Sequence, residues 1–403
     1  MKLNSRRALV SMMMVGGLLA AACSSNSSTS TTTTSSSGGS SGSATVSVTT
    51  FNKDFTTMAN LKSVTSSGKG KVAVILPDTV SSARYTEFDA PYLAKAFAAA
   101  GLSTSDTIIQ NAQGSDSTQL TDAQSDISSG ASVLVVDPLD PGVGTSIETY
   151  AKSHGVPVVD YDRLVLGGTR KYYVSFDNVK VGTLIGNGMV SCIASWNVAT
   201  PTLAVMVGSP TDNNATLFAQ GYNAVLAPKV SSGAYKVVAK PAGTWDPPTA
   251  LTEFQQAYTA HSTINAVLVP NDENAAPIIS YLKTLNIPAK KFPVTGQDAT
   301  LVGLQNIISG YQCGTAYKPI YLEAQAAAAL ALYLRDGKTP PAGLVNGAVK
   351  DTTANVSVPS SLLVPEWVTP TNMESTVIAD GFVPASQLCA GAYAADCTTY
   401  GIH

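Results

Sequence analysis

From Lys71 onward, one pattern repeats along the chain: a short apolar run, a polar turn, and a stretch with helical periodicity. The apolar runs are rich in β-branched residues and nearly unbroken, which is typical of strands buried on both faces of a parallel sheet. They are KVAVILPD (71–78), ASVLVVDP (131–138), VPVVDYDR (156–163), TLAVMVGSP (202–210), YKVVAKP (235–241), INAVLVPND (264–272) and FPVTGQD (292–298). The helical stretches between them include YLAKAFAAAGL (92–102), SIETYAKSHG (146–155), LFAQGYNAVLA (217–227) and PIISYLKTLN (277–286).

This alternation of strands and helices predicts an α/β fold with right-handed crossovers. An eight-stranded barrel would contain a similar number of units. The segment YYVSFDNVKVG (172–182) interrupts the pattern, and we interpret it as irregular. That interruption favours two doubly wound parallel-sheet domains of the Rossmann-like type over a closed barrel.

Most of the predicted strands run directly into charged, amide or aromatic side chains. In doubly wound sheets, ligands bind beyond the carboxyl ends of the strands, so these side chains are expected to converge on one polar ligand. The residues at the predicted strand ends are Asp78, Arg84, Tyr85, Asp162, Arg163, Asp212, Asn213, Asn214, Trp245, Asn271, Asp272, Gln297, Asp298 and Lys318.

A sugar matches this set of side chains. Each sugar hydroxyl donates and accepts, carboxylates only accept, Arg and Lys only donate, and amides do both. The planar forks of Arg84 and Arg163 can bridge neighbouring hydroxyls, and the flat rings of Tyr85 and Trp245 can cover the apolar face of a pyranose.

Each of these residues also has a purely structural interpretation. Asp and Asn after a strand are common helix N-caps, and DNNATLF (212–218) has that pattern. Trp245 in TWDPP could fill the core, and YDR (161–163) could be an ion pair that joins two loops. The prediction of a ligand site therefore rests on the recurrence across strand ends.

The composition excludes several other functions. Hydrophobic residues make up 44% of the 403-residue chain and charged residues 13%, which suits large packed cores. The net charge of −3 gives no support for a nucleic-acid partner. The three histidines stand in no metal-ligand spacing, and the chain has no GxxxxGK[ST] and no GxGxxG after the first strand, so we expect no metal and no cofactor.

The N-terminus has the pattern of an export signal. Lys2, Arg6 and Arg7 precede an apolar stretch that is too short to span a membrane and ends in AAAC. We predict a lipoprotein signal peptide at 1–22, with cleavage before Cys23 and lipidation of that cysteine; the alternative is ordinary secretion with cleavage nearby. A tether is predicted at 23–69, in which Ser24 to about Thr45 is a Ser/Thr/Gly run with no capacity to form a core.

Four cysteines follow Cys23, and an even number in an exported chain favours disulfides. Four cysteines allow three connectivities. Cys389 and Cys397 are close in sequence and are expected to pair, which leaves Cys192 for Cys313. A zinc site is the alternative, but no CxxC spacing supports it.

Several motifs also resemble a known family. They are LPD (76–78), YDR (161–163), SFDNVKVG (175–182), GSPTDNNA (208–215), NDENAA (271–276), TGQDA (295–299) and YKPI (317–320). Their order resembles that of the periplasmic D-xylose-binding proteins, the sugar-capturing subunits of ABC importers in the ribose/galactose-binding class. The resemblance covers about Lys71 to Phe382, and the cysteine pattern and N-terminus resemble the actinobacterial branch.

The resemblance implies a type I periplasmic binding protein fold with two lobes joined by three crossovers, near Asn178, Lys318 and Val356. One lobe would comprise 70–178 with 318–355, and the other 179–317 with 356–403. The implied sugar-binding residues are Arg84, Tyr85, Arg163, Asp212, Asn214, Trp245, Asn271, Asp298 and Lys318. Tyr85 stands where the family has Trp, and TVSSARY (79–85) is about one residue longer; both departures from the family pattern bear on which sugar is bound.

The function predicted from these features is capture of a monosaccharide, D-xylose or a related aldose, in an interdomain cleft, with delivery to an ABC permease and its ATPase. The sugar would bind the closed form better and so favour closure. The protein would be a monomer, anchored outside the cytoplasm by lipidated Cys23. The alternatives are an exported sugar receptor for a membrane sensor and an exported glycosidase, which would use two facing carboxylates such as Asp212 and Asp298.

Overall fold

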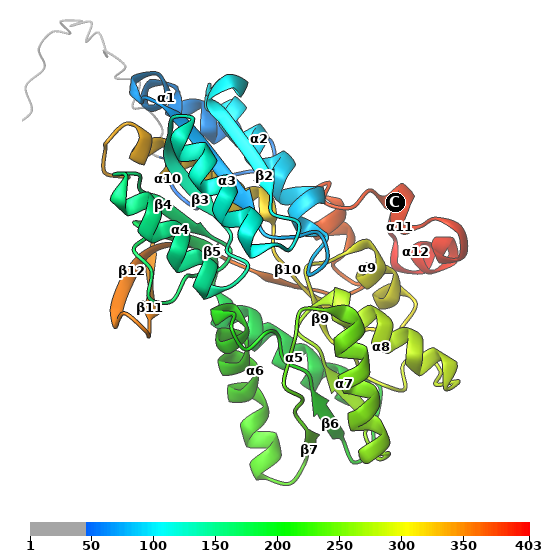
Figure 1. The fold of residues 1–403 in the computed structure, drawn as a ribbon. Helices are drawn as coiled ribbons and strands as arrows, with labels where there is room; N and C mark the ends of the chain where they lie inside the picture. The colour runs from blue at the N-terminus through cyan, green and yellow to red at the C-terminus, as the bar shows by residue number, and fades with distance from the viewer. Residues whose placement is uncertain (1–45) are drawn as a thin grey trace, which may run out of the picture. The chain divides into compact units, whose positions relative to one another are not determined.

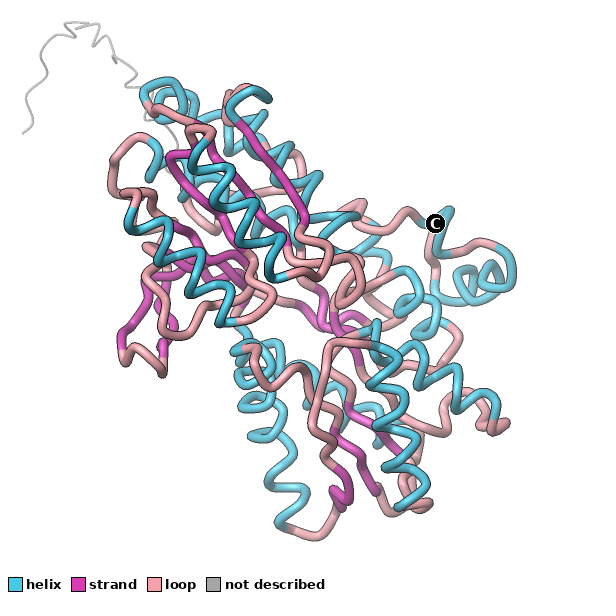
Figure 2. Tube along the Cα trace, viewed as in Figure 1, coloured by secondary structure: helices cyan, strands magenta, loops and turns pink. Residues whose placement is uncertain are grey.

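The computed structural model describes residues 46–403, and these form two α/β lobes (Figures 1 and 2). The predicted signal peptide and Cys23 lie outside the described residues. Strands of both lobes lie between layers of helices, so the two doubly wound domains are confirmed and the single barrel is excluded. Among residues 46–403, none of the helices combines the length and hydrophobicity needed to cross a membrane.

The N-terminal lobe is built on a seven-stranded sheet of order β11-β12-β5-β4-β3-β1-β2, in which only β11 is antiparallel to its neighbour. Its strands are β1 (Lys71–Leu76), β2 (Thr107–Asn111), β3 (Ala131–Val136), β4 (Val158–Tyr161), β5 (Tyr172–Phe176), β11 (Gly347–Asp351) and β12 (Val356–Leu363). Its helices are η1 (Thr56–Leu61), α1 (Lys62–Ser67), η2 (Tyr85–Asp89), α2 (Ala90–Ala99), η3 (Thr104–Asp106), α3 (Asp116–Ser128), α4 (Pro141–Ser153) and α10 (Ile320–Arg335).

Both faces of this sheet are buried, which explains the unbroken apolar runs. In β1, Val72 and Val74 pack into the core beneath α2 and α10, whereas Ala73 and Ile75 pack against α3 and α4 on the opposite face. Because successive strand side chains point to opposite faces, every position must be apolar when helices cover both.

The C-terminal lobe has two three-stranded groups, β7-β6-β8 and β13-β10-β9, linked by a bridge between Val267 and Val294. Its strands are β6 (Thr202–Val205), β7 (Lys236–Ala239), β8 (Ala266–Leu268), β9 (Gly296–Gln297), β10 (Thr315–Tyr317) and β13 (Glu366–Val368). Its helices are α5 (Asn178–Ser195), α6 (Asn213–Ser231), α7 (Pro247–Ala260), α8 (Asp272–Thr284), α9 (Leu301–Ile308), η4 (Glu374–Ile378), α11 (Ala385–Leu388), η5 (Gly391–Tyr393) and α12 (Ala394–Tyr400).

Three predictions about the chain's organisation need correction. Residues 46–69 are not a tether, because Phe55, directly before η1, and Met58 and Leu61 on η1 are buried in the core of the N-terminal lobe. The segment 172–182 is not irregular, since it contains the buried strand β5 and the start of α5. The structure instead shows a regular strand-to-helix crossover at this point.

The third crossover also lies later than predicted. Strand β12 pairs in parallel with β5, so residues 356–363 belong to the N-terminal lobe's sheet rather than to the C-terminal lobe. The chain crosses after Leu363, at Val364 and Pro365, and β13 then pairs with β10. The other two crossovers lie at Asp177, after β5, and at Lys318 and Pro319, after β10, as expected.

Both predicted disulfides are present: Cys192 with Cys313, and Cys389 with Cys397. The first joins the end of α5 to the segment before β10, with a sequence separation of 121, whereas the second closes a separation of only 8. No cluster of ligands suited to a metal ion occurs within residues 46–403.

The unequal loops predict unequal contributions to stability. A disulfide restricts the unfolded chain more when it closes a longer loop. We expect the Cys192→Ser/Cys313→Ser variant to lose roughly 2 kcal/mol more unfolding free energy than Cys389→Ser/Cys397→Ser. Urea unfolding of both variants measures the difference, and equal losses would show that native packing rather than loop closure dominates.

Candidate functional site

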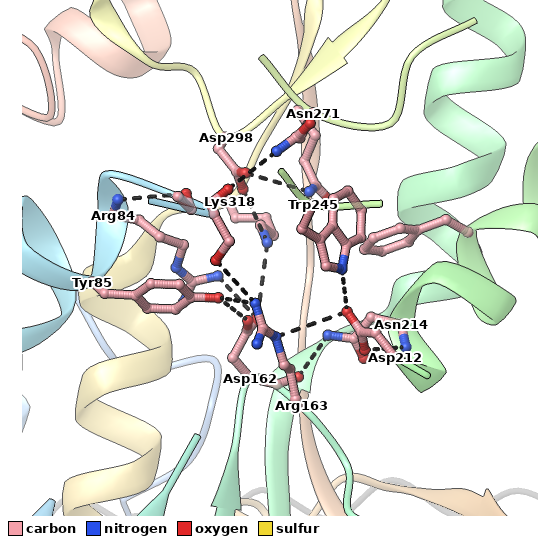
Figure 3. A pocket seen from close by; sticks show the side chains of 14 residues that line it. Arg84, Tyr85, Asp162, Arg163, Asp212, Asn214, Trp245, Asn271, Asp298 and Lys318 are labelled. Atoms are coloured by element: carbon pink, nitrogen blue, oxygen red, sulfur yellow. Dashed lines mark hydrogen bonds and ion pairs between the residues drawn. The ribbon is translucent and has the colours of Figure 1, made fainter. Parts of the chain in front are cut away.

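The nine predicted ligand residues all line one chamber between the lobes (Figure 3). Together with them, Ser81, Ser82, Asp162, Phe218 and Gln297 complete its wall. The residues come from segments after β1 and β4 in one lobe and after β6, β7, β8, β9 and β10 in the other. The polar strand ends therefore identified one cavity, which we call the inner chamber, although three of the fourteen residues expected to converge, Asp78, Asn213 and Asp272, do not line it.

Arg84 is held by carboxylates rather than left free in the chamber. Its guanidinium donates two hydrogen bonds to Asp89, at 2.7 and 2.8 Å, one to Asp162 at 2.9 Å and one to Glu323 at 2.6 Å. An Arg side chain has five N–H donors, so these four bonds leave a single N–H for a ligand. Asp89 on η2 and Glu323 on α10 were not predicted, because nothing in the sequence links these helical carboxylates to the strand ends.

The VVDYDR segment ends its strand in a sharp change of direction. Tyr161 is the last residue of β4, and Asp162 adopts a left-handed backbone with φ of 54°. Burial raises the pKa of Asp162, but Arg84, Lys318 and Arg163 outweigh it and lower the pKa to about 2. Asp162 therefore stays ionised, and it lines the chamber beside the nine predicted residues.

Arg163 lies at the centre of the chamber. It donates to the hydroxyl of Tyr85 at 3.0 Å and to that of Ser81 at 3.3 Å. Its Nε lies 3.8 Å from a carboxylate oxygen of Asp137 and 3.8 Å from one of Asp212. Asp137 is fully buried, and its carboxylate accepts no hydrogen bond from the described residues, so it acts on the chamber through the charge of Arg163.

Asp212 combines the two roles that the sequence left open. One carboxylate oxygen accepts from the backbone N–H of Asn214 at 2.8 Å and caps α6. The other accepts from the indole N–H of Trp245 at 2.9 Å and faces the chamber. The Trp245 ring packs on Gly208, where an added Cβ would lie 2.1 Å from the ring, and it meets Phe218 edge-on. Asp212 therefore caps α6, holds the Trp245 ring and forms part of the chamber wall at the same time.

Asn214 connects the two lobes close to the first crossover. Its amide donates to the carbonyl of Asp162 at 2.8 Å and accepts from the Tyr173 hydroxyl at 3.0 Å and the Asn178 amide at 2.8 Å. These bonds use much of its hydrogen-bonding capacity, so its side chain lines the chamber and also joins β4 and β5 to α5 and α6.

Asp298 and Lys318 form the ion pair on the C-terminal side of the chamber. Lys318 Nζ lies 3.0 Å from Asp298 and 3.9 Å from Asp162, so the ammonium joins carboxylates of both lobes. Asp298 has a φ of 90° and Ala299 a φ of 53°. Non-glycine residues in this region are strained, and such strain is concentrated at functional sites.

A second contact between the lobes lies beside the chamber. Glu273, in the first turn of α8, accepts from the Ser82 hydroxyl at 3.0 Å and from the backbone N–H of Ala83 at 3.2 Å. Asn271 caps the same helix and donates to the carbonyl of Ser81 at 3.4 Å. The 81–83 loop of one lobe is therefore held by the start of a helix in the other.

The chamber is small in this closed arrangement. Only about 30 Å³ of space remains between its side chains, because Arg163, Tyr85 and Lys318 extend into it and contact their neighbours (Figure 3). A monosaccharide would enter by separating the lobes or displacing the Arg163–Tyr85 contact. The arrangement can bind a polyol through charged donors and acceptors, with a ring from each lobe.

A family model described as a periplasmic binding protein domain matches residues 72–339. The chain belongs to the periplasmic binding proteins. Like the fold, this membership confirms the sequence prediction, and it makes the chain a binding protein rather than an enzyme. The two facing carboxylates considered for a glycosidase, Asp212 and Asp298, are instead bonded to Trp245 and Lys318.

Several relatives of this periplasmic binding protein carry the names of sugar-binding proteins. The D-xylose-binding periplasmic protein of Escherichia coli K12 is 38% identical over 283 residues, which cover 70% of this chain and 82% of that protein. The multiple sugar-binding periplasmic receptor ChvE of Rhizobium radiobacter is 33% identical and covers 79% and 92%. A carbohydrate transporter solute binding protein from Chloroflexus aurantiacus, solved with D-glucose, has a TM-score of 0.69 at 25% identity and covers 78% and 97%.

The buried carboxyls of this binding protein predict a stability that falls as pH rises. Burial raises the pKa of Asp272 to about 7 and those of Glu273 and Glu323 to about 8. A raised pKa means that the folded form holds the proton more tightly, so its stabilising contribution is complete below the unfolded pKa and is lost as pH rises through the folded value. We expect a higher midpoint of thermal unfolding at pH 5.5 than at pH 8.5.

Glu273→Gln tests the source of this pH dependence. The amide cannot ionise, so the variant should show a weaker fall in the unfolding midpoint between pH 5.5 and pH 8.5 than the parent protein. Glu366→Gln, at an exposed position, is the matched control and should leave the fall unchanged. A profile in Glu273→Gln identical to that of the parent would show that this carboxyl does not contribute.

Proposed function

We propose that this periplasmic binding protein captures a monosaccharide, D-xylose or a related aldose, in the inner chamber and delivers it to an ABC importer. The observation that supports it most is the convergence of Arg163, Asp212, Trp245, Asp298 and Lys318 from both lobes on one chamber. A ligand there contacts both lobes, so it binds the closed form better and shifts the population towards closure.

The proposed binding roles follow from the chemistry of each group. Asp298 and Asp212 accept from sugar hydroxyls, Lys318 and Arg163 donate to them, and the amides of Asn271 and Asn214 do either. Tyr85 and Trp245 cover opposite apolar faces of the ring. Arg84 contributes one N–H and mainly holds Asp162 and Asp89, the last residue of the η2 turn that begins at Tyr85.

We propose that Tyr85 determines which sugar binds. Its hydroxyl accepts from Arg163 at 3.0 Å and donates to Asp162 at 3.3 Å, so it offers an acceptor that the indole N–H of a Trp ring cannot supply. A site built to bond a hydroxyl strongly rejects an analogue without it. We therefore expect Tyr85→Trp to change the ranking of pentoses and hexoses.

The proposal also includes where the protein acts. Lipidation of Cys23 and the Ser/Thr/Gly tether would anchor a monomer at the outer face of the membrane within reach of its permease. A receptor role, in which the closed form is read by a membrane sensor, is the second candidate, because the 33%-identical ChvE protein is named a receptor. The same sugar site would serve either role.

Thermal unfolding in the presence of a panel of pentoses and hexoses tests the proposal. A ligand that binds only the folded form stabilises it by about 2.7 kcal/mol at 100 times its Kd. A raised midpoint with xylose or a related aldose is the expected result. If no monosaccharide raises the midpoint, the sugar proposal fails, and the charged strand ends serve only as caps and ion pairs.

A further inference from the structure

A second cavity opens directly beside the inner chamber. We call it the vestibule; Val80, Gln113 and Leu139 line it from the N-terminal lobe, and Ser209 and Asp246 from the C-terminal lobe. It also shares four wall residues with the inner chamber. They are Ser81, Arg163, Asp212 and Trp245. The two cavities are thus separated only by side chains that the proposed sugar would touch.

The vestibule is much larger than the inner chamber. It encloses about 290 Å³, whereas about 30 Å³ remains in the chamber. Small-molecule sites begin at roughly 300 Å³, so the vestibule approaches the size of a binding site. Both lobes contribute to its wall, and a group bound there would favour the closed form as the chamber ligand does.

The free groups of the vestibule suit a neutral polyol rather than an ion. The carboxylate of Asp78 accepts from the backbone of Val80 and Ser81, and that of Asp246 caps α7, so these charges are already used. Val80 is 61% exposed and offers an apolar surface beside Leu139. The Gln113 amide donates one hydrogen bond to Asn111 at 3.2 Å, and the Ser209 hydroxyl bonds that of Thr211 at 2.9 Å. Each keeps further hydrogen-bonding capacity that a sugar hydroxyl can use.

We propose that the vestibule is a subsite for the second residue of a glycoside, so that the ligands of this protein include disaccharides. The first sugar occupies the inner chamber, and its glycosidic substituent passes beside Arg163 and Trp245 into the vestibule. This inference rests on the proposed sugar binding and extends its substrate class from monosaccharides to glycosides of the same sugar.

The test compares affinities for one sugar and its glycosides. Isothermal titration calorimetry is carried out with the monosaccharide that gives the largest thermal shift, with its disaccharides and with its phenyl glycosides, both anomers included. We expect at least one glycoside to bind as tightly as the monosaccharide. Val80→Trp, which fills the vestibule, should weaken glycoside binding by about tenfold or more and change monosaccharide binding by less than about twofold.

Val302→Trp is the matched control, because Val302 is also exposed, at 47%, but lies on α9 and outside both cavities. It should leave both affinities unchanged. Binding of the monosaccharide without any glycoside overturns the subsite while leaving the proposed function intact. Glycoside binding that Val80→Trp does not weaken also overturns it, since the substituent would then lie elsewhere. Binding of neither ligand rejects the proposed function itself.

Discussion

Arg84→Ala is expected to lower the unfolding free energy by about 3–5 kcal/mol, because it removes the cation shared by three buried carboxylates. Asp89 and Glu323 are fully buried and Asp162 nearly so, and all three lie within 2.9 Å of the guanidinium. A buried charge without its partner pays the cost of desolvation with no compensation. Urea unfolding of the variant and the parent protein measures the loss.

Arg84→Lys separates charge from geometry in the same cluster. Lysine restores the positive charge but lacks the planar fork that bonds Asp89 through two nitrogens, so it should recover only part of the lost stability. Well above pH 8, where Glu323 is ionised, Arg84→Ala combined with Glu323→Gln should be less destabilised than Arg84→Ala alone, because one uncompensated carboxylate is removed. A loss below about 1 kcal/mol for Arg84→Ala would mean that these carboxyls accept protons readily when the cation is absent.

The parts of the fold that the sequence predicted correctly share one physical origin. Strands such as β1 and β3 are covered by helices on both faces, so burial forces an unbroken apolar run that can be read without knowing the fold. The half-buried strand β2, at the edge of its sheet, has no such run and was missed. In β12, Pro359, Ser360 and Ser361 interrupt the apolar pattern although both serines are fully buried, so the third crossover was placed too early.

The sequence does contain a pattern that indicates burial of residues 46–69. Phe51, Phe55, Met58, Leu61 and Val64 recur every three or four residues, which is the spacing of a helix with one buried face. The prediction of a tether extended the Ser/Thr/Gly composition of the adjoining residues over this stripe. When composition is averaged over a long segment, a short periodic row of apolar residues at the end of that segment is not visible.

More of the site than of the fold could be predicted from the sequence, because the polar residues that indicate the site recur at the ends of several strands. A single Asp after a strand has an equally good interpretation as a helix cap, and Asp212 is indeed a cap. Only the parallel topology brings the ends of seven strands into one wall, so many weak indications became one strong prediction. Asp89 and Glu323 lie on helices and therefore beyond that rule, and they contact Arg84 rather than line the chamber. Asp137 does follow a strand, β3, but it is fully buried behind Arg163.

The contacts between the lobes suggest how ligand binding and closure are linked. Glu273 holds the 81–83 loop and Asn214 holds the carbonyl of Asp162, and both lie beside ligand-facing residues of the opposite lobe. Closure therefore fixes the loop that carries Ser81 and Ser82 at the same time as it completes the chamber. Under the proposed function, these contacts would form only when the lobes close on the ligand, and their energy would raise the affinity without a further sugar contact.

Asp298→Asn is expected to weaken binding of the sugar by roughly 30-fold to several thousand-fold, which corresponds to about 2–5 kcal/mol. The change removes the anion that lies 3.0 Å from Lys318 and replaces a pure acceptor with an amide. Lys318 is then left with Asp162, at 3.9 Å, as its nearest carboxylate. Titration calorimetry with the sugar that gives the largest thermal shift measures the loss.

Asparagine is the appropriate substitution because position 298 has a φ of 90°. Asn tolerates positive φ better than most side chains, so the backbone is preserved, whereas an Ala variant would combine lost chemistry with added strain. Asp54→Asn, at an exposed position, is the control for the charge change alone and should bind normally. If Asp298→Asn kept its affinity within about threefold, the strained backbone at this position would serve the packing of β9 against β10 rather than the ligand.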